Sequence, residues 1–350
     1  MLTVGPPRAR VHLPSGRVCR DHAPVRIALC ILLLTLGCEP AAAPASSSAE
    51  PAPARVALPD CALEAPRAHD GTDPVLGDAS LGHAALVVHR PGPELLTLGA
   101  EEETHALPLD RVHAIDDDRD GWVIAGLHEG SGVLLFVDRA GAERRRLALP
   151  VALRTPVMRV VGDHAWLFGR VGPALVLLRA ELLTGRVSEV RRQAVAQAAP
   201  LLAGQGRRAF ASWTARGAEV WTLRGGAEPD AQPAPGTPQA LAVGETPALF
   251  FRAPDRTGLW LHGPDGALLA TQPTSRPEAV VARRAGDAIA LLYASNRDVW
   301  LTRVNEAGER AAPVVVAPGA RAAQLRGDAR GLVIAWERDG QTHTRVARCP

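Results

Sequence analysis

Seven short apolar runs about 41 residues apart, each followed by a turn-rich stretch, predict an all-β chain folded as a β-propeller of seven four-stranded blades. In addition, no segment keeps a 3.6-residue apolar period over three turns, so helix is expected to be a minor component. Finally, two cysteines stand at opposite ends of the repeat region. Together these observations predict one large repeat domain whose first and last segments meet.

The apolar runs form one column when the repeats are stacked. Continuous apolar runs bounded by Gly, Pro, Asp and Asn suit strands that are buried on both faces between neighbouring blades. The column consists of Ala85–Val88, Trp122–Ala125, Ala165–Phe168, Ala209–Trp213, Ala248–Phe251, Ala290–Tyr293 and Leu332–Trp336.

A second apolar run follows most members of this column after about ten residues, as expected for the next strand of a blade. Turn-rich stretches such as Gly263–Gly266 and Asn305–Gly308 come after it. The second runs are Val133–Phe136, Leu175–Leu178, Val220–Leu223, Leu259–Leu261 and Val299–Leu301.

The last repeat, from about Ala322, ends with its third strand at Thr342–Cys349. We expect Arg55–Leu58 to supply the missing outer strand, which would place Cys61 beside Cys349 and allow a disulfide to form. Six or eight blades, two β-sandwiches and two unrelated thiols remain open alternatives.

The N-terminal region, residues 1–37, has the features of an export signal. Arg26 precedes the apolar run Ile27–Gly37, which is too short to span a bilayer as a helix. The polar residues 1–24 leave open a translation start nearer the apolar run. Leu34–Cys38 (LTLGC) resembles the signal of bacterial lipoproteins, and this resemblance implies cleavage after Gly37 and a lipid on Cys38. An ordinary signal peptide is the alternative.

Residues 38–54 follow the predicted cleavage site, and beyond Cys38 they contain only Ala, Pro, Ser and Glu up to residue 54. Such a segment has no large apolar side chain to bury, so it is expected to be a disordered tether. The predicted propeller domain is therefore residues 55–349. The chain is expected in the cell envelope, anchored to the inner or outer membrane and facing the periplasm or the exterior.

The charge of the chain excludes several function classes. All 39 basic residues are arginine, and the part after Gly37 has 34 arginines against 36 acidic residues. This near balance does not predict nucleic-acid binding. The absence of lysine also excludes a standard phosphate-loop nucleotide site and lysine Schiff-base chemistry.

The repeat region resembles bacterial envelope propellers of the broad WD40-like or PQQ-like kind in architecture only. Neither a recurring Gly-His and Trp-Asp signature nor a sialidase-type box is present. The resemblance therefore implies a fold but no catalytic or binding residues.

One acidic string, Asp116–Gly121, has Asp at alternate positions followed by Gly, as calcium loops do. We predict two alternatives for it. Either Asp116, Asp118 and Asp120 hold Ca²⁺, or the string is a solvated hairpin turn. The EF-hand glutamate position is Leu127, which does not fit a complete calcium loop of that kind.

Arginines recur at the turn between the second and third strand of six repeats. In a propeller these turns share one face, so the arginines can form a rim that holds a carboxylate, a phosphate or an acidic loop through charge-assisted hydrogen bonds. Ordinary exposed turn residues are the alternative. The predicted rim residues are Arg90, Arg170, Arg216, Arg256, Arg297 and Arg338.

Two function classes follow from these features. The first is a non-catalytic binding or scaffold propeller, tethered to the membrane, that recruits an envelope protein or an anionic glycan. The second is an envelope polysaccharide hydrolase or lyase, which needs two carboxylates that face one bond at the channel mouth. An arginine-lined channel favours the first class and a cluster of carboxylates the second.

Overall fold

The computed structural model describes residues 58–350 with short gaps, all within the second of two compact units, Ala54–Pro350. The predicted signal, Cys38 and the tether lie outside the described residues. The gaps within 58–350 are 79–81, 100–101, 195–199, 206–207, 215–217, 224–228, 235–237, 244–246, 253–257, 263–267, 274–276 and 329–330.

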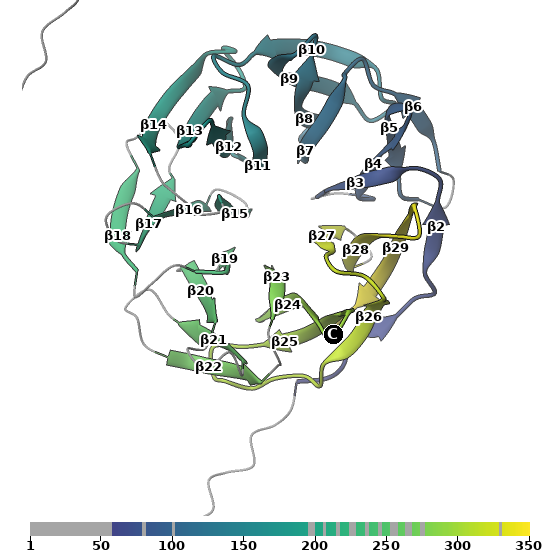
Figure 1. Cartoon of the computed structure of the whole chain (residues 1–350), viewed down its shortest axis with the longest axis vertical. Helices are drawn as coiled ribbons and strands as arrows, with labels where there is room; N and C mark the ends of the chain where they lie inside the picture. The colour runs from purple at the N-terminus through teal and green to yellow at the C-terminus, as the bar shows by residue number, and fades with distance from the viewer. Residues whose placement is uncertain are drawn as a thin grey trace, which may run out of the picture. The chain divides into compact units, whose positions relative to one another are not determined.

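Seven antiparallel sheets are arranged in a ring in this unit, which confirms the seven-bladed β-propeller (Figure 1). Six blades follow the order of the chain from the centre outward, and the seventh combines both ends of the unit. Blade 1 contains β3 (Thr72–Gly77), β4 (Ala85–Arg90), β5 (Gly92–Thr97) and β6 (Thr104–Ala106). Blade 2 contains β7 (Arg111–Asp118), β8 (Gly121–His128), β9 (Ser131–Asp138) and β10 (Glu143–Ala148). Blade 3 contains β11 (Arg154–Val161), β12 (His164–Val171), β13 (Ala174–Glu181) and β14 (Val187–Ala194). Blade 4 contains β15 (Leu201–Gln205), β16 (Arg208–Thr214), β17 (Ala218–Leu223) and β18 (Asp230–Pro233). Blade 5 contains β19 (Ala240–Val243), β20 (Pro247–Arg252), β21 (Gly258–His262) and β22 (Leu268–Pro273). Blade 6 contains β23 (Glu278–Ala285), β24 (Ala288–Ser295), β25 (Asp298–Val304) and β26 (Val314–Pro318). Blade 7 contains β27 (Gln324–Asp328), β28 (Gly331–Arg338) and β29 (Gln341–Arg348), with β1 (Ala62–Leu63) and β2 (Arg67–His69) at its outer edge.

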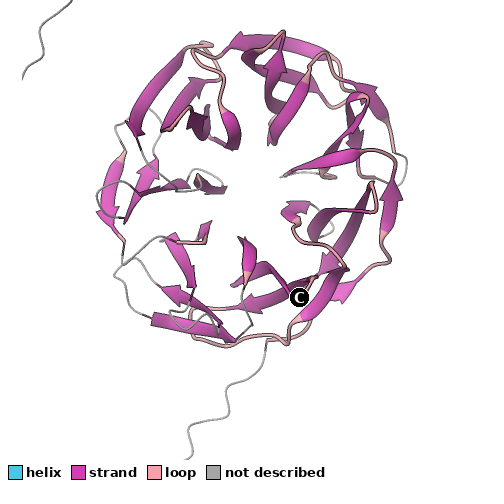
Figure 2. Cartoon of the chain, viewed as in Figure 1, coloured by secondary structure: helices cyan, strands magenta, loops and turns pink. Residues whose placement is uncertain are grey.

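The described residues consist of strands, turns and loops without helix (Figure 2). Accordingly, they include no helix long and apolar enough to cross a bilayer.

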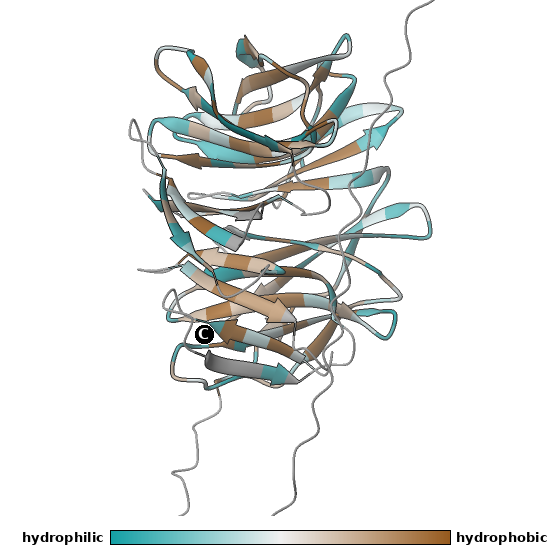
Figure 3. Cartoon of the chain, turned by 60° about the vertical axis from the view of Figure 1, so that its left-hand side comes forward, coloured by the Kyte–Doolittle hydropathy of each residue, from teal (hydrophilic) through white to brown (hydrophobic). Residues whose placement is uncertain are grey.

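Packing between blades explains why the second strands are apolar on both faces. In β8, Trp122 and Ile124 belong to the buried cluster between blades 1 and 2, whereas Val123 and Ala125 belong to the cluster between blades 2 and 3. Each face of a strand is thus buried against a different neighbour, since successive side chains point to opposite faces. Figure 3 shows apolar residues along the strands and polar residues at many hairpin ends.

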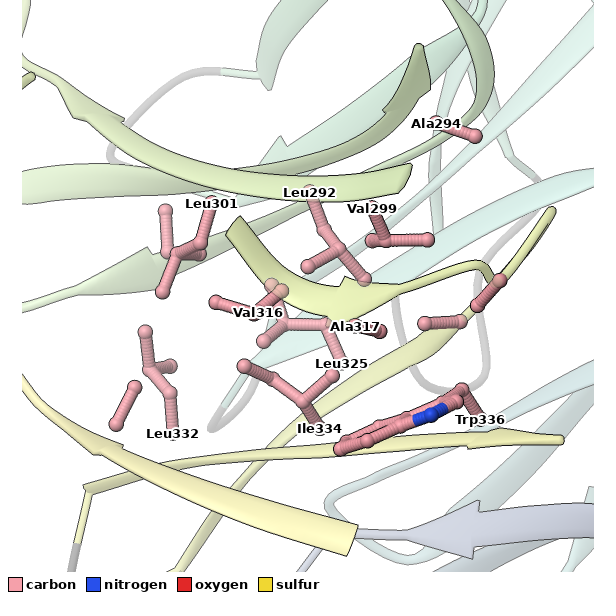
Figure 4. Packing of buried hydrophobic residues seen from close by; sticks show 14 residues of the cluster. Leu292, Ala294, Val299, Leu301, Val316, Ala317, Leu325, Leu332, Ile334 and Trp336 are labelled. Atoms are coloured by element: carbon pink, nitrogen blue, oxygen red, sulfur yellow. The ribbon is translucent and has the colours of Figure 1, made fainter. Parts of the chain in front are cut away.

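Each of the seven contacts between neighbouring blades has its own buried apolar cluster among the described residues. The cluster between blades 6 and 7 contains Leu292 and Leu301 from one sheet and Ile334 and Trp336 from the next (Figure 4). The repeat therefore specifies both the strands and the contacts that join the blades.

The ends of the unit are joined at blade 7. The disulfide between Cys61 and Cys349 is present, with a Cα–Cα distance of 4.2 Å. The closing strands are β1 and β2, which pair with β29 and follow Cys61. The prediction that Arg55–Leu58 supplies the outer strand was wrong in position: Leu58 lies outside any strand, and 55–57 lie outside the described residues.

Buried polar contacts also hold β2 against blade 7. The Nε2 atom of His69 lies 2.7 Å from Oγ1 of Thr344, and its Nδ1 atom lies 3.4 Å from a carboxylate oxygen of Glu102. Burial lowers the pKa of His69, which favours the neutral ring near pH 7. The strand is thus fixed by specific polar contacts that have no counterpart in an apolar sequence pattern.

Candidate functional site

The innermost strands surround the axis of the ring, which we call the channel (Figure 1). One level of these strands carries charged residues. Four innermost strands carry a charged residue at the same register position, opposite the third residue of the second strand of the blade. These residues are Asp116 of β7, Arg159 of β11, Arg283 of β23 and Arg326 of β27. Asp78, directly after β3, joins them through its contacts. We call these five residues the channel tier.

Asp78, in blade 1, contacts residues of three other blades across the channel. Its carboxylate lies 2.5 Å from Nη1 of Arg283 and 3.9 Å from Nη1 of Arg159, and it accepts a hydrogen bond of 2.9 Å from the backbone N–H of Gly327. Burial by itself raises the pKa of Asp78, but the neighbouring arginines, led by Arg283, outweigh burial and hold this pKa below its ordinary value. Asp78 is therefore a fixed negative charge that neutralises mainly Arg283.

Asp116 occupies the equivalent level in blade 2 but has a different environment. Its side chain accepts a 2.7 Å hydrogen bond from the backbone N–H of Val160 in blade 3, and the residue is 3% exposed. Burial raises the pKa of Asp116 to about 7; Arg159 opposes this increase and Asp78 reinforces it. Asp116 is thus a weaker counter-charge than Asp78, because burial favours its protonated form.

Arg159 and Arg326 consequently have less opposing charge than Arg283. Nη1 of Arg326 donates to the carbonyl of Leu325 at 2.9 Å, while its buried Nε has no hydrogen-bond partner. Burial, reinforced by the positive charge of Arg159, lowers the pKa of Arg326 to about 9. Nη1 of Arg159 donates to the carbonyl of Met158 at 3.1 Å. The tier therefore has an excess of partly buried positive charge.

A cavity of about 310 Å³ lies within the ring of innermost strands and is lined in part by this tier. Most of its wall is apolar, from residues such as Met158, Leu202, Leu241 and Val281. In the described part of the chain, no Asp or Glu lines the cavity, since Asp78 and Asp116 lie behind the wall. The charged and polar lining residues are His113, Arg159, Arg283, Arg284, Gln324 and Arg326.

Two glycines leave room for the arginine side chains. A Cβ on Gly327 would lie 2.9 Å from Nη2 of Arg283, and one on Gly204 would lie 3.1 Å from Cβ of Arg159. Both distances are shorter than ordinary contacts between carbon and its neighbours. The sequence thus provides small residues where two tier arginines approach the neighbouring strand.

The structure describes four of the six predicted rim arginines. All four lie at or next to the turn between the second and the third strand of a blade. Arg90 ends β4, Arg170 lies near the end of β12, Arg297 is in the turn between β24 and β25, and Arg338 ends β28. Arg216 and Arg256, the other two predicted residues, lie outside the described residues. The strand order places these turns on the face opposite the turns that follow the innermost strands.

Local groups neutralise part of this rim. Nε of Arg90 donates to the carbonyl of Asp70 at 2.6 Å, and Nη1 lies 3.6 Å from Glu94. Arg338 lies 3.4 Å from the carboxylate of Asp339. Arg297 and Arg338 are exposed to solvent, so the rim offers positive side chains on an open surface rather than in an enclosed site.

The acidic string lies at the end of β7 and in the following turn. Asp118 and Asp120 lie 2.8 Å and 3.4 Å from guanidinium nitrogens of Arg144, whereas Asp116 points to the backbone of Val160. The residues that the structure describes include no group of three acidic, His or Cys side chains arranged to hold a metal. The calcium site stays a prediction.

Sequence reasoning missed the channel tier although the repeat contained a signal for it. Asp116, Arg159, Arg283 and Arg326 each stand seven residues ahead of their partner in the second strand. Stacking the repeats at this position reveals a charged residue on the innermost strand of four blades, and buried charges are uncommon unless they are paired. What the stacking does not reveal is the contact of Asp78 with Arg159, because it crosses the ring.

Fold and channel together define the chain as a seven-bladed β-propeller with an arginine-lined channel. No protein-family model matches the sequence, and no curated protein matches it. Solved structures of similar fold include the Mitotic Checkpoint Complex, with a TM-score of 0.60, 10% identity, and coverage of 81% of this chain and 94% of that one. A streptogramin B lyase has a TM-score of 0.57 and 10% identity, with coverage of 81% of this chain and 98% of the lyase. The WD40 domain of Pan2 from Neurospora crassa has a TM-score of 0.53 and 11% identity, with coverage of 82% of this chain and 95% of that domain. These similarities show the fold alone.

Proposed function

We propose that the protein is an envelope lipoprotein whose propeller is a non-catalytic binding or scaffold module for a protein or an anionic ligand. The observation that carries this proposal is the arginine-lined wall of the channel cavity. Arginine binds carboxylates and phosphates through paired, charge-assisted hydrogen bonds. Both carboxylates of the tier already accept hydrogen bonds from backbone N–H groups of neighbouring blades.

The proposed docking surface for a protein or an anionic glycan is the rim. Arg297 and Arg338 are exposed there, on turns of adjacent blades 6 and 7. Exposed turns on a rigid scaffold are common positions for binding residues. A chain of similar fold occurs in the structure of the Mitotic Checkpoint Complex, which is a protein assembly.

Crosslinking in intact cells followed by affinity purification tests the rim. The test variant is Arg297→Ala with Arg338→Ala, and the matched control is Arg119→Ala with Arg186→Ala, which removes two exposed arginines from turns on the opposite face. We expect a specific partner that is retained by the control and lost from the rim variant. A partner that both variants retain, or the absence of any partner above background, contradicts the proposed docking surface.

Membrane attachment is a separate part of the proposal and rests on the signal-like residues 34–38. Two or more acyl chains on Cys38 would hold the protein stably on a membrane. Cell fractionation and mass spectrometry of the N-terminal peptide test it. We expect the wild-type protein in the membrane fraction with a lipid on Cys38, and Cys38→Ser in the soluble fraction.

A second candidate is the polysaccharide hydrolase or lyase, and the environment of Asp116 favours it. A carboxyl group with a pKa near 7 has the property that a general acid needs. Such an enzyme also needs a second carboxylate facing the same bond. Release of reducing or unsaturated sugar ends from envelope polysaccharides, abolished by Asp116→Asn, would favour the enzyme over the binding module.

A further inference from the structure

We infer that the channel cavity binds a small organic oxyanion, a carboxylate or phosphate ester with a compact apolar body, whose charged group contacts Arg159 and Arg326. The inference rests on the proposed function in treating the propeller as a binding module. It concerns the channel cavity and not the rim, and it narrows the anionic ligand of that proposal to a small oxyanion with an apolar body.

The balance of charge around the cavity is the first argument. Arg283 has a close carboxylate partner, at 2.5 Å, whereas Arg159 reaches the same carboxylate only at 3.9 Å. Arg326 has no carboxylate within 4.0 Å among the ion pairs of the described residues. A buried cation without a full counter-charge is unfavourable, so an added anion would be stabilised there.

Unused hydrogen-bond donors are the second argument. Nη1 of Arg326 donates to a backbone carbonyl, but the buried Nε donates to nothing. An oxyanion in the cavity would accept from guanidinium N–H groups of Arg326, which lines it, since guanidinium donors form a planar fork that fits two oxygens. The buried Nε without a partner shows that the protein itself does not use the full hydrogen-bonding capacity of this guanidinium.

The size and the polarity of the cavity indicate the size and the apolar character of the uncharged part of the ligand. A volume of about 310 Å³ is at the small end of the range for ligand pockets. Most of the wall consists of apolar side chains and small residues, including Met158, Leu202, Leu241 and Leu325. A large sugar chain would not fit, whereas an aromatic or short aliphatic body with one acidic group would.

Isothermal titration calorimetry on the purified full chain, in a low-salt buffer without multivalent anions, tests this inference. The probes are benzoate and phenyl phosphate, with benzamide as the uncharged control. We expect saturable one-to-one binding of at least one anionic probe and much weaker binding of benzamide. No saturable binding of either anion up to about 10 mM, or equal binding of benzamide, would overturn the inference, because a charge-assisted pair normally contributes measurable affinity.

Matched variants locate the site. Arg326→Gln and Arg159→Gln should each weaken the anionic probe about tenfold or more, while Arg338→Gln, which removes the same charge from the rim, should leave binding unchanged. Equal weakening by Arg338→Gln would show long-range attraction in place of a channel site. Circular dichroism and the melting temperature of each variant verify that the ring is intact, and the use of two channel variants keeps the test decisive if one fails to fold. Because the rim experiment uses other residues, failure here leaves the proposed docking surface standing.

Discussion

The channel and the rim both contain arginines, but the two sets differ in how their charge is balanced. On the rim, Arg90 and Arg338 have local carboxylates and carbonyl oxygens, and solvent reaches the surface. In the channel, Arg159 and Arg326 are largely withdrawn from solvent and have incomplete counter-charges. An exposed ion pair contributes little free energy, whereas a buried charge without a partner is expensive.

The difference shows that recurrence along the sequence and strength of a binding site are separate properties. The rim arginines recur in six repeats because exposed turns tolerate charge, and this chain uses arginine at every basic position. The tier arginines occupy fewer repeats but converge on one cavity. Convergence in space, rather than recurrence, is therefore the better guide to a ligand.

Replacing Arg283 by Gln should give the largest change in stability. The substitution removes the closest partner of the Asp78 carboxylate and leaves that buried charge poorly compensated. We expect the free energy of unfolding to fall by about 3–5 kcal/mol. Urea denaturation followed by tryptophan fluorescence measures it.

The control for this prediction is Arg338→Gln on the rim, which should change the free energy of unfolding by about 0.5 kcal/mol or less. Similar losses for the two variants would remove the distinction between channel and rim.

Asp116→Asn should change how stability depends on pH. A folded-state pKa of about 7, above the ordinary 3.8, means that the folded protein binds more protons than the unfolded chain between these pH values. The contribution of Asp116 is therefore fully present at low pH and is lost as the pH rises through about 7. The size of this loss is on the order of 4 kcal/mol, since the pKa rises from 3.8 to about 7 and each pKa unit corresponds to about 1.4 kcal/mol.

Asn keeps the acceptor for the N–H of Val160 but cannot ionise. The variant should therefore gain stability relative to wild type as the pH rises from 4 to 8, in urea titrations at several pH values. A constant difference between the two proteins across this range would contradict the raised pKa.

Arg326→Gln should stabilise the ligand-free protein by about 1–2 kcal/mol, because it removes a buried cation whose charge is not fully opposed. Melting curves in a buffer free of multivalent anions measure the effect. A marked destabilisation would show that Asp78 and Asp116 already compensate Arg326, and the contrast between channel and rim would then disappear.

Asp118→Asn should give the smallest effect, a loss of about 0.5–1 kcal/mol, because its ion pair with Arg144 is only partly buried. The same samples test the predicted calcium site. If Asp116, Asp118 and Asp120 hold Ca²⁺, adding 1 mM CaCl₂ should raise the melting temperature of the wild type and not of the variant. Equal melting temperatures with and without calcium would favour the simple hairpin turn.

The sequence was sufficient to predict the propeller because each second strand is buried on both faces. Trp122 and Val123, for example, enter different clusters on opposite faces of β8, and this burial requires an apolar residue at every position. The disulfide could also be predicted, since only two cysteines remained for the folded part and they bracket the repeats.

The position of the closing strands could not be predicted from an apolar sequence pattern. β1 and β2 are short and partly polar, and they form strands because β29 offers an unpaired edge and His69 meets Thr344. The apolar residues of Arg55–Leu58 resembled a strand more closely. Similarly, the charged tier depends on contacts across the ring, such as Asp78 with Arg159, which have no local signature.

The most direct measurement is a crystal structure of the protein soaked in selenate at low ionic strength, with the anion located by the anomalous signal of selenium. The account predicts a selenate in the channel, with oxygens about 3 Å from guanidinium nitrogens of Arg326 or Arg159. Selenate bound only near Arg297 and Arg338, with an empty channel, would contradict the claim that the incompletely neutralised arginines form the anion site.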